Sequence, residues 1–465
     1  MPPSLPRVVI VGAGIGGLAA AHHLTRQAAE RGRSLEVVVL EAADRPGGWL
    51  ATERCEGALL EHGPDTMVTH KPAGLALCER LALSGRLVFK PAGRIDILDG
   101  GRLLPLPAGF ALAAPTRARP LLASPLLSWH GKLRALAEPW VRPHVSGSAD
   151  ESVASFVRRR FGEELYRRIS EPVVGGLFMA DTESLSLAAT FPRLAGGQPP
   201  PPASRGPSAR KSPPPPAAAT LDGGLGQIVP VLVTRLPEGS LRLGRKVRAL
   251  AREGQGFILH LGEEPPLAAD AVLLALPASA AAALLAGLDP ALAGELGQIA
   301  YASAVTAHLA WRGQAVTRDP GCHGFFVPRA AGSPVVAASF VSVKYPERIP
   351  ADQMVVRVFL GGALHPDAIG RPDAELVALS ANLLAPLLGI DEPPLWSRVW
   401  RHPSAMPQRR VGHPALVARL RERLGAHPGL EFAGGPLGAY GLPDSIAEGE
   451  GAADRLLGRV VPPGT

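Results

Sequence analysis

The chain has little of three features that would each assign it to a simple class of protein. It has 3 cysteines in 465 residues, with no C-x-x-C pair, which favours a reducing compartment and argues against a disulfide framework. It has no run of 18 or more apolar residues, so a membrane-spanning helix is not expected. It also lacks a basic helix with interleaved aromatic residues, so nucleic acid is not the expected partner despite the net charge of +7.

Other signals of function are missing as well. No signal or transit peptide is expected, because the first predicted strand already begins at Arg7; this favours a cytoplasmic protein. The histidines are scattered without ligand spacing, so no metal site is predicted. No Ser/His/Asp constellation is present, and we therefore assign no catalytic acid or base.

What the chain does contain is a glycine-rich turn near its start. Residues 7–11 are a β-branched run typical of a buried parallel strand, and a helical pattern follows the turn. Gly12, Gly14 and Gly17 have G-x-G-x-x-G spacing. Gly12 would allow the tight turn, Gly14 would let the backbone approach a pyrophosphate, and Gly17 would let helix and strand pack closely. The pattern predicts a dinucleotide at the helix N-terminus.

An acidic residue supports this prediction. Glu41 ends the second predicted strand at about the 20-residue spacing expected for a carboxylate that binds ribose hydroxyls. A carboxylate there would repel a 2′-phosphate, which leaves NAD and FAD as the candidate cofactors. A βαβ turn without any ligand is the purely structural interpretation of the same pattern.

The following segments resemble the amine-oxidase-like superfamily of flavoproteins. The resemblance rests on the motifs DRPGGW at residues 44–49 and EHGP at 61–64. A longer block, 152–194, contains FVRRRFGEE, EPVVGGLF and LSLAATFP and is similar to the protoporphyrinogen oxidases of that superfamily. The closing segment, YGLPDSI at 440–446, resembles the superfamily's last flavin contact, with Pro443 where relatives often have Asn.

The resemblance implies FAD as the cofactor. It places FAD against the phosphate turn, the second fingerprint, the loop after it, one backbone position and the C-terminal turn: Gly12, Ala13, Gly14, Ile15, Gly16, Gly17, Glu41, Ala42, Arg45, Gly48, Trp49, Gly63, Pro64, Asp65, Thr66, Val247, Gly434, Gly435, Tyr440, Gly441, Leu442 and Ile446.

The resemblance also implies a substrate, protoporphyrinogen IX, which loses six electrons as three hydrides to the flavin, with dioxygen as acceptor and hydrogen peroxide as product. Coproporphyrinogen III is an alternative substrate. Arg94 is similar to a propionate-binding arginine, and Phe340 to an aromatic residue placed against a pyrrole ring. Without the resemblance, Arg94 would be a surface arginine at a strand edge and Phe340 a core residue. An amine oxidase, a carotenoid desaturase and a non-catalytic chain of the same fold are the competing hypotheses for function.

The predicted fold is α/β, with a Rossmann-like FAD-binding domain, a mixed-sheet substrate domain and a helical membrane-associating subdomain. Residues 110–140 combine apolar clusters with arginines and lysines, which suits either a membrane interface or helices packed on the core. The membrane interpretation predicts a peripheral protein on the inner face of the cell membrane. The oligomeric state is open, with a homodimer as one option. The expected divisions are FAD-binding parts at 1–93, 221–298 and 396–465, a helical part at 94–197, a Pro-rich loop at 198–220 and a substrate sheet at 299–395.

Overall fold

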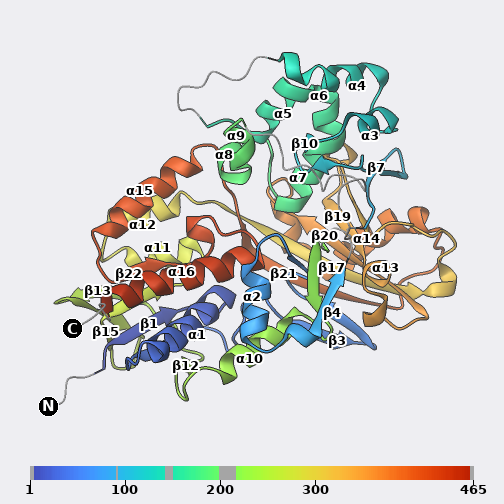
Figure 1. Cartoon of the computed structure of the whole chain (residues 1–465). Helices are drawn as coiled ribbons and strands as arrows, with labels where there is room; N and C mark the ends of the chain where they lie inside the picture. Colours follow the sequence, from blue (N-terminus) through green and yellow to red (C-terminus); the bar gives the residue numbers. More distant parts are fainter. Residues whose placement is uncertain (1–4, 91–92, 142–149, 198–215, 461–465) are drawn as a thin grey trace, which may run out of the picture.

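The computed structural model describes residues 5–90, 93–141, 150–197 and 216–460 (Figure 1). Most of the Pro-rich segment therefore lies outside the described residues. Two large sheets organise the rest, one parallel and one mostly antiparallel, as the sequence predicted.

The parallel sheet contains the predicted nucleotide-binding strand at its centre. Its five strands are all parallel and lie in the order β12 (Leu241–Arg242), β2 (Glu36–Leu40), β1 (Arg7–Val11), β16 (Ala271–Leu274) and β22 (Leu430–Phe432). Strands from three distant parts of the chain thus share one sheet, which is the Rossmann-like arrangement.

Side chains of β1 alternate between two cores. Val8 and Ile10 face the helices α1 (Ile15–Glu30) and α16 (Leu442–Val460), whereas Val9 and Val11 face a second apolar cluster. The elements of that second cluster are β13 (Ala249–Glu253), β14 (Gly256–His260), β15 (Leu267–Ala269), α11 (Ala278–Leu285), α12 (Pro290–Gly297) and α15 (His413–Gly425). Both faces are covered, which explains why β1 is apolar throughout.

The second sheet has seven strands: β21 (Trp396–Pro407), β17 (Tyr301–Arg312), β20 (Gln353–Gly361), β19 (Val335–Phe340), β18 (Gly324–Phe326), β7 (Ile95–Asp99) and β8 (Arg102–Pro105). Only β18 and β7 pair in parallel. Helix α14 (Asp373–Leu388) packs on this sheet through Leu376, Leu384 and Leu388.

Two boundaries in this region differ from the expectation. Residues 396–407 were assigned to the FAD-binding part, but β21 pairs along β17 and so belongs to the seven-stranded sheet. The hairpin β7–β8, expected with the helical part, joins the same sheet. Sheet membership depends on which distant strand edges meet, and local sequence does not encode that.

The helical part covers one end of the seven-stranded sheet (top of Figure 1). Its helices are α3 (Ala118–Ala123), α4 (Trp129–Leu136), α5 (Val153–Phe161), α6 (Glu163–Leu165), α7 (Glu171–Phe178), α8 (Leu187–Thr190) and α9 (Pro192–Ala195). Pro172 lies in the first turn of α7, where proline is tolerated, and Gly175 and Gly176 continue the helix. The helix ends at Met179, which has a left-handed φ of 50°.

Shorter elements join the two large sheets. They are β3 (Thr52–Cys55), β4 (Ala58–Glu61), β5 (Met67–Val68), α2 (Ala73–Arg80), β6 (Leu87–Lys90), β9 (Phe110–Ala111), β10 (Ala114–Pro115), β11 (Ala218–Leu221), α10 (Ile228–Thr234) and α13 (Val341–Lys344), with short 3-10 turns at Leu225–Gln227, Pro346–Arg348 and Gly435–Leu437. Strand β19 ends at Phe340, and α13 follows it directly.

Candidate active site

The glycine turn has the geometry that its spacing predicts. Gly12 has φ +105°, and a Cβ at Gly12 would lie 2.5 Å from the Ala275 carbonyl oxygen. A Cβ at Gly17 would lie 2.0 Å from the Gly12 carbonyl oxygen, so only glycine allows this approach of helix and strand. Gly14 differs, because a Cβ there would meet no atom within 4 Å.

A dinucleotide fits this open face. Gly14 is partly buried yet has free space beside it, and as the N-cap of α1 it provides no side-chain capping bond. The first N–H groups of a helix need partners, and a pyrophosphate supplies them. Ile15 and Gly16 continue the same first turn. The start of α1 therefore has the geometry that a pyrophosphate needs.

Glu41 lies beside this turn. Its Oε2 accepts from the Ala13 N–H at 2.7 Å, and its Oε1 accepts from the Ala43 N–H at 2.9 Å. A carboxylate has about four acceptor positions, so it retains capacity for ribose hydroxyls. The partly exposed segment continues through Ala42, which follows directly.

The second fingerprint folds back onto the first. The Gly47 N–H donates to the Ala13 carbonyl at 2.8 Å, and a Cβ at Gly48 would lie 3.5 Å from the Gly14 Cα. Arg45 Nη2 donates to the Gly48 carbonyl at 2.8 Å, which stabilises the turn. Trp49 is 43% exposed at the end of this turn, so its ring can cover a ligand.

The C-terminal turn meets the same place. Helices α1 and α16 lie side by side (blue and red in Figure 1), and a Cβ at Gly449 would lie 2.2 Å from the Gly16 carbonyl oxygen. Gly434 and Gly441 have positive φ and open space beside them, and Gly435 follows Gly434. Leu442 and Ile446 are 4% and 0% exposed and pack in the apolar core, so the structure gives these two predicted contacts almost no accessible surface. Pro443 is the second residue of α16, where proline is tolerated.

Two further predicted contacts are less exposed. Tyr440 donates its hydroxyl to the Leu177 carbonyl at 2.9 Å and lies 4.6 Å from the Phe178 ring, so it attaches the turn to α7. Burial raises the pKa of its phenol. Val247 is 6% exposed and packs among apolar side chains of the second cluster; its predicted backbone contact with the adenine stays a prediction.

The loop from Gly63 to Thr66 contacts the turn at residues 44–49 on one side and the seven-stranded sheet on the other. A Cβ at Gly63 would lie 2.2 Å from the Trp49 carbonyl oxygen, so the two segments touch, and Pro64 follows. Lys344 Nζ lies 3.0 and 2.9 Å from the two oxygens of Asp65 and 3.1 Å from Thr66 Oγ1. Burial acts to raise the pKa of Asp65, but Lys344 and Arg357 outweigh it and hold that pKa well below its usual range.

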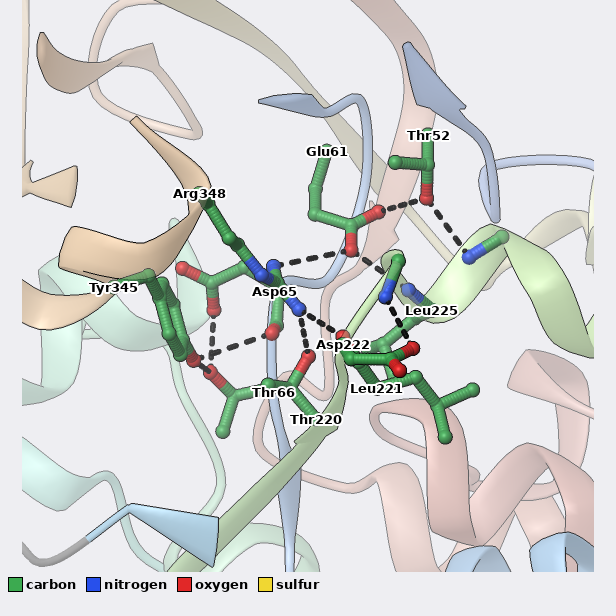
Figure 2. A network of polar contacts seen from close by, with 12 residues as sticks. Thr52, Glu61, Asp65, Thr66, Thr220, Leu221, Asp222, Leu225, Tyr345 and Arg348 are labelled. Carbon is green, nitrogen blue, oxygen red and sulfur yellow. Dashed lines mark hydrogen bonds and ion pairs between the residues drawn. The ribbon is translucent and has the colours of Figure 1, made fainter. Parts of the chain in front are cut away.

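A buried network that the sequence did not reveal supports this loop (Figure 2). Glu61 accepts from the Thr52 hydroxyl and from the Leu225 N–H, both at 2.7 Å, and lies 3.4 Å from Arg348. Arg348 also donates to Thr220 Oγ1 at 2.6 Å and to the Leu221 carbonyl at 2.5 Å. The adjacent Tyr345 hydroxyl lies 2.6 Å from Thr66 Oγ1. Strands β4 and β11 and the segment after β19 therefore converge under the loop.

A cluster of aromatic and imidazole rings also lies close to this loop, and the sequence did not reveal it. The Trp49 ring is 5.1 Å from His402, and Trp400 is 4.4 Å from His62 and 4.9 Å from His308. His402 Nε2 lies 3.1 Å from Thr306 Oγ1. Burial lowers the pKa of all three histidines, to about 4 for His402, so their rings are neutral. The three histidines are far apart in the sequence, and no regular spacing indicates that they come together in the fold.

The two predicted substrate contacts differ. Arg94 is half exposed; its Nε and Nη2 hold both oxygens of the buried Asp96 at 2.9 and 2.8 Å. Nη2 also donates to the Pro320 carbonyl at 3.3 Å, and the half-exposed guanidinium keeps the propionate prediction open. The prediction for Phe340 is wrong as a direct contact: the side chain is 0% exposed and packs 5.8 Å from Phe325 in the sheet core. The core interpretation holds, because this strand is covered on that face by other apolar side chains.

Comparisons with known proteins decide the class. A family model described as flavin containing amine oxidoreductase matches residues 15–457. The chain belongs to this family. The motif-based resemblance is thereby confirmed, and with it the oxidoreductase class and the FAD cofactor.

Individual proteins of known name are similar to this chain over nearly its whole length. The chain is 35% identical to a coproporphyrinogen III oxidase of Propionibacterium freudenreichii subsp. freudenreichii, over 97% of this chain and 90% of the relative. It is 29% identical to human protoporphyrinogen oxidase over 97% and 98% of the two chains. A solved structure from Exiguobacterium sp., provisionally named a protoporphyrinogen oxidase, superposes with a TM-score of 0.82 at 28% identity over 97% and 98%.

Proposed function

We propose that this flavoprotein oxidises a porphyrinogen to the porphyrin in heme biosynthesis. The observation that carries the proposal is the likeness over 97% of the chain to enzymes named for this reaction. A solved amine oxidase from Brevibacterium oxydans has the same fold at only 18% identity, which speaks for the fold alone. The missing catalytic acid or base is not an obstacle, since pyrrole N–H protons can leave to solvent.

The sequence prediction is protoporphyrinogen IX, oxidised in three two-electron steps with dioxygen as acceptor. Coproporphyrinogen III is a second candidate, favoured by the name of the relative that is 35% identical. Both are flexible macrocycles with propionates, which need a cation, and the half-exposed guanidinium of Arg94 is the predicted one. A bound flavin supplies the hydride acceptor; the chain supplies position and shelter from water.

Anaerobic addition of each porphyrinogen to the purified yellow protein tests the proposal. We expect the visible flavin band to bleach with at least one of the two, and the faster substrate identifies the preference. Fluorescence of the porphyrin product and hydrogen peroxide formed after admission of air complete the test. A band that persists with both substrates would contradict the proposal.

We further propose that helix α4 and the turn after it contact an anionic membrane surface. Trp129, Leu133 and Trp140 are 69%, 64% and 83% exposed, and Trp129 and Leu133 lie one turn apart. Arg119 is exposed nearby in the chain, and the net charge is +7. Exposed tryptophan and leucine beside cations suit a lipid interface. Leu121, Leu126 and Leu127 of the same region pack in the core.

Contact of this kind would be peripheral. Over the described ranges, no helix has the length and apolar character needed to cross a bilayer. Co-sedimentation with vesicles containing an anionic lipid should capture the protein, and Trp129→Ser with Trp140→Ser should release it. Neutral vesicles are the control, and equal binding of variant and native protein would contradict this surface. The molar mass of the eluting species, measured by light scattering, would test the homodimer prediction in the same preparation.

A further inference from the structure

Arg357 of β20 is a buried cation that lies against residues 62–66, the loop that is expected to contact the flavin. Its side chain is 4% exposed, and Nη2 donates to the carbonyl oxygens of His62 at 2.9 Å and Gly63 at 2.7 Å. In the part of the chain that the structure describes, its Nε is buried without a hydrogen-bond partner, and no carboxylate forms an ion pair with it. Burying an unpaired charge is costly, so its presence needs a physical reason.

The charges around Arg357 do not cancel. Two other cations lie in the same region: Lys344, which pairs with Asp65, and Arg348, which pairs with Glu61. Three cations therefore face two carboxylates; a further carboxylate, Glu53, lies 3.1 Å from His62 and is matched by a fourth cation, Arg398, at 3.8 Å. The neighbouring His62, His308 and His402 add no charge, because burial lowers the pKa of each ring. A guanidinium stays protonated even when burial lowers its pKa, as it does here. One positive charge thus remains uncompensated.

The positive charge of Arg357 lies next to Gly63 and Trp49, two residues that are predicted to contact the flavin. Arg357 bonds the carbonyl of Gly63, and Gly63 touches the backbone of Trp49. The Trp49 ring in turn contacts His402. The guanidinium therefore approaches the loop from the side of the seven-stranded sheet, whereas the start of α16 approaches the same region from the other end of the chain.

We propose that Arg357 is a positioning residue that holds the His62–Gly63 carbonyls in place and supplies an uncompensated positive charge that favours the negatively charged reduced flavin. The inference rests on the proposed function only in assuming that the flavin lies against this loop. The physical reason is electrostatic: a preorganised charge in a dry site acts strongly on a charge that develops nearby.

The test is the midpoint potential of the bound flavin, measured anaerobically against reference dyes. In Arg357→Gln we expect the equilibrium to shift at least tenfold toward the oxidised flavin, which is about 30 mV for a two-electron couple. Arg357→Lys keeps the charge and should recover most of the potential. An unchanged potential in Arg357→Gln would overturn the proposal.

Two further variants keep the test decisive. His308→Gln is the matched control, since His308 is 2% exposed, close to Arg357 and neutral; it should leave the potential unchanged. An equal shift in His308→Gln would mean that packing and not charge sets the potential, and would overturn the proposal. Asp65→Asn removes a negative charge and should shift the equilibrium the opposite way, toward reduced flavin. If Arg357→Gln does not fold, the absence of this opposite shift would overturn the proposal.

The same samples separate this inference from the proposed function. Bleaching of the native protein by a porphyrinogen supports the function whatever Arg357 does. If neither porphyrinogen bleaches the native protein, the function fails, while the measured potentials still decide the role of Arg357.

Discussion

The ammonium of Lys344 donates to both carboxylate oxygens of Asp65, at 3.0 and 2.9 Å, and to the hydroxyl of Thr66 at 3.1 Å. These contacts use all three of its N–H donors. Lys344 is therefore saturated by the loop, so it fixes the loop and is not available to bind substrate. It links the seven-stranded sheet to the segment expected to carry the flavin.

Lys344→Met should destabilise the protein by about 2–4 kcal/mol at pH 7, because it leaves the largely buried Asp65 without its cation. The double variant Lys344→Met with Asp65→Asn should recover much of that loss. Denaturant unfolding of the native protein, the two single variants and the double variant gives the coupling energy between Lys344 and Asp65. Lys90→Gln, which removes a cation paired with the more exposed Glu347, is the control and should cost less than about 1 kcal/mol. Additive losses in the double variant would contradict the predicted pairing.

Acid should weaken the fold partly through His402. Its pKa is about 4 in the folded protein and about 6.5 when unfolded, so between these values the unfolded chain binds more protons. Stability therefore falls as pH is lowered from 6.5 to about 4, by up to about 3 kcal/mol for this residue. His402→Gln should show a flatter dependence over that window. Parallel curves for native and variant proteins, from unfolding measured at several pH values, would contradict this.

Asp65 acts in a lower range of pH. Its folded pKa is depressed, so its contribution is complete above its unfolded pKa of about 4 and is lost as pH falls through the folded value. The stability difference between native protein and Asp65→Asn should be constant from pH 5 to 7 and shrink below about 4. A difference that vanishes near neutral pH would be inconsistent with the ion pair.

Two glycines of the same motif should respond differently to alanine. Gly17→Ala would place a Cβ 2.0 Å from the Gly12 carbonyl oxygen, so it should disrupt folding. Gly14→Ala meets no protein atom within 4 Å, so it should fold normally; if the pyrophosphate binds this turn as predicted, the added methyl group should weaken FAD binding at least tenfold. Thermal unfolding of FAD-free protein and FAD titration separate the two effects. Unchanged FAD affinity in Gly14→Ala would remove this turn from the cofactor site.

Arg94 needs a compensated variant, because Arg94→Ala leaves the fully buried Asp96 unpaired and should destabilise the protein by about 3 kcal/mol. Arg94→Ala with Asp96→Asn removes both charges. If Arg94 binds a propionate, KM should rise at least tenfold with little change in kcat. Asp96→Asn alone controls for the loss of the carboxylate. An unchanged KM in the double variant would exclude Arg94 from the substrate site.

The amino-acid sequence by itself determined the local and adjacent parts of this protein. The glycine spacing predicted the turn between β1 and α1, since backbone conformation and close approach depend on residues only a few positions apart. The position of Glu41 beside the glycine turn was predictable, because β1 and β2 are neighbouring parallel strands that end at the same edge of the sheet. Pro443 at the start of α16 was predictable from the helix rules.

Only the tertiary structure decided which distant residues meet. Arg357, His308 and His402 come from β20, β17 and β21 and converge under a loop near residue 63, and no short-range pattern encodes that convergence. The same holds for β21, whose partner is chosen by sheet assembly, and for Phe340, whose burial depends on what covers its strand. Local chemistry sets conformation, whereas burial and charge pairing depend on long-range packing; the loop's support and its unpaired cation belong to the second kind.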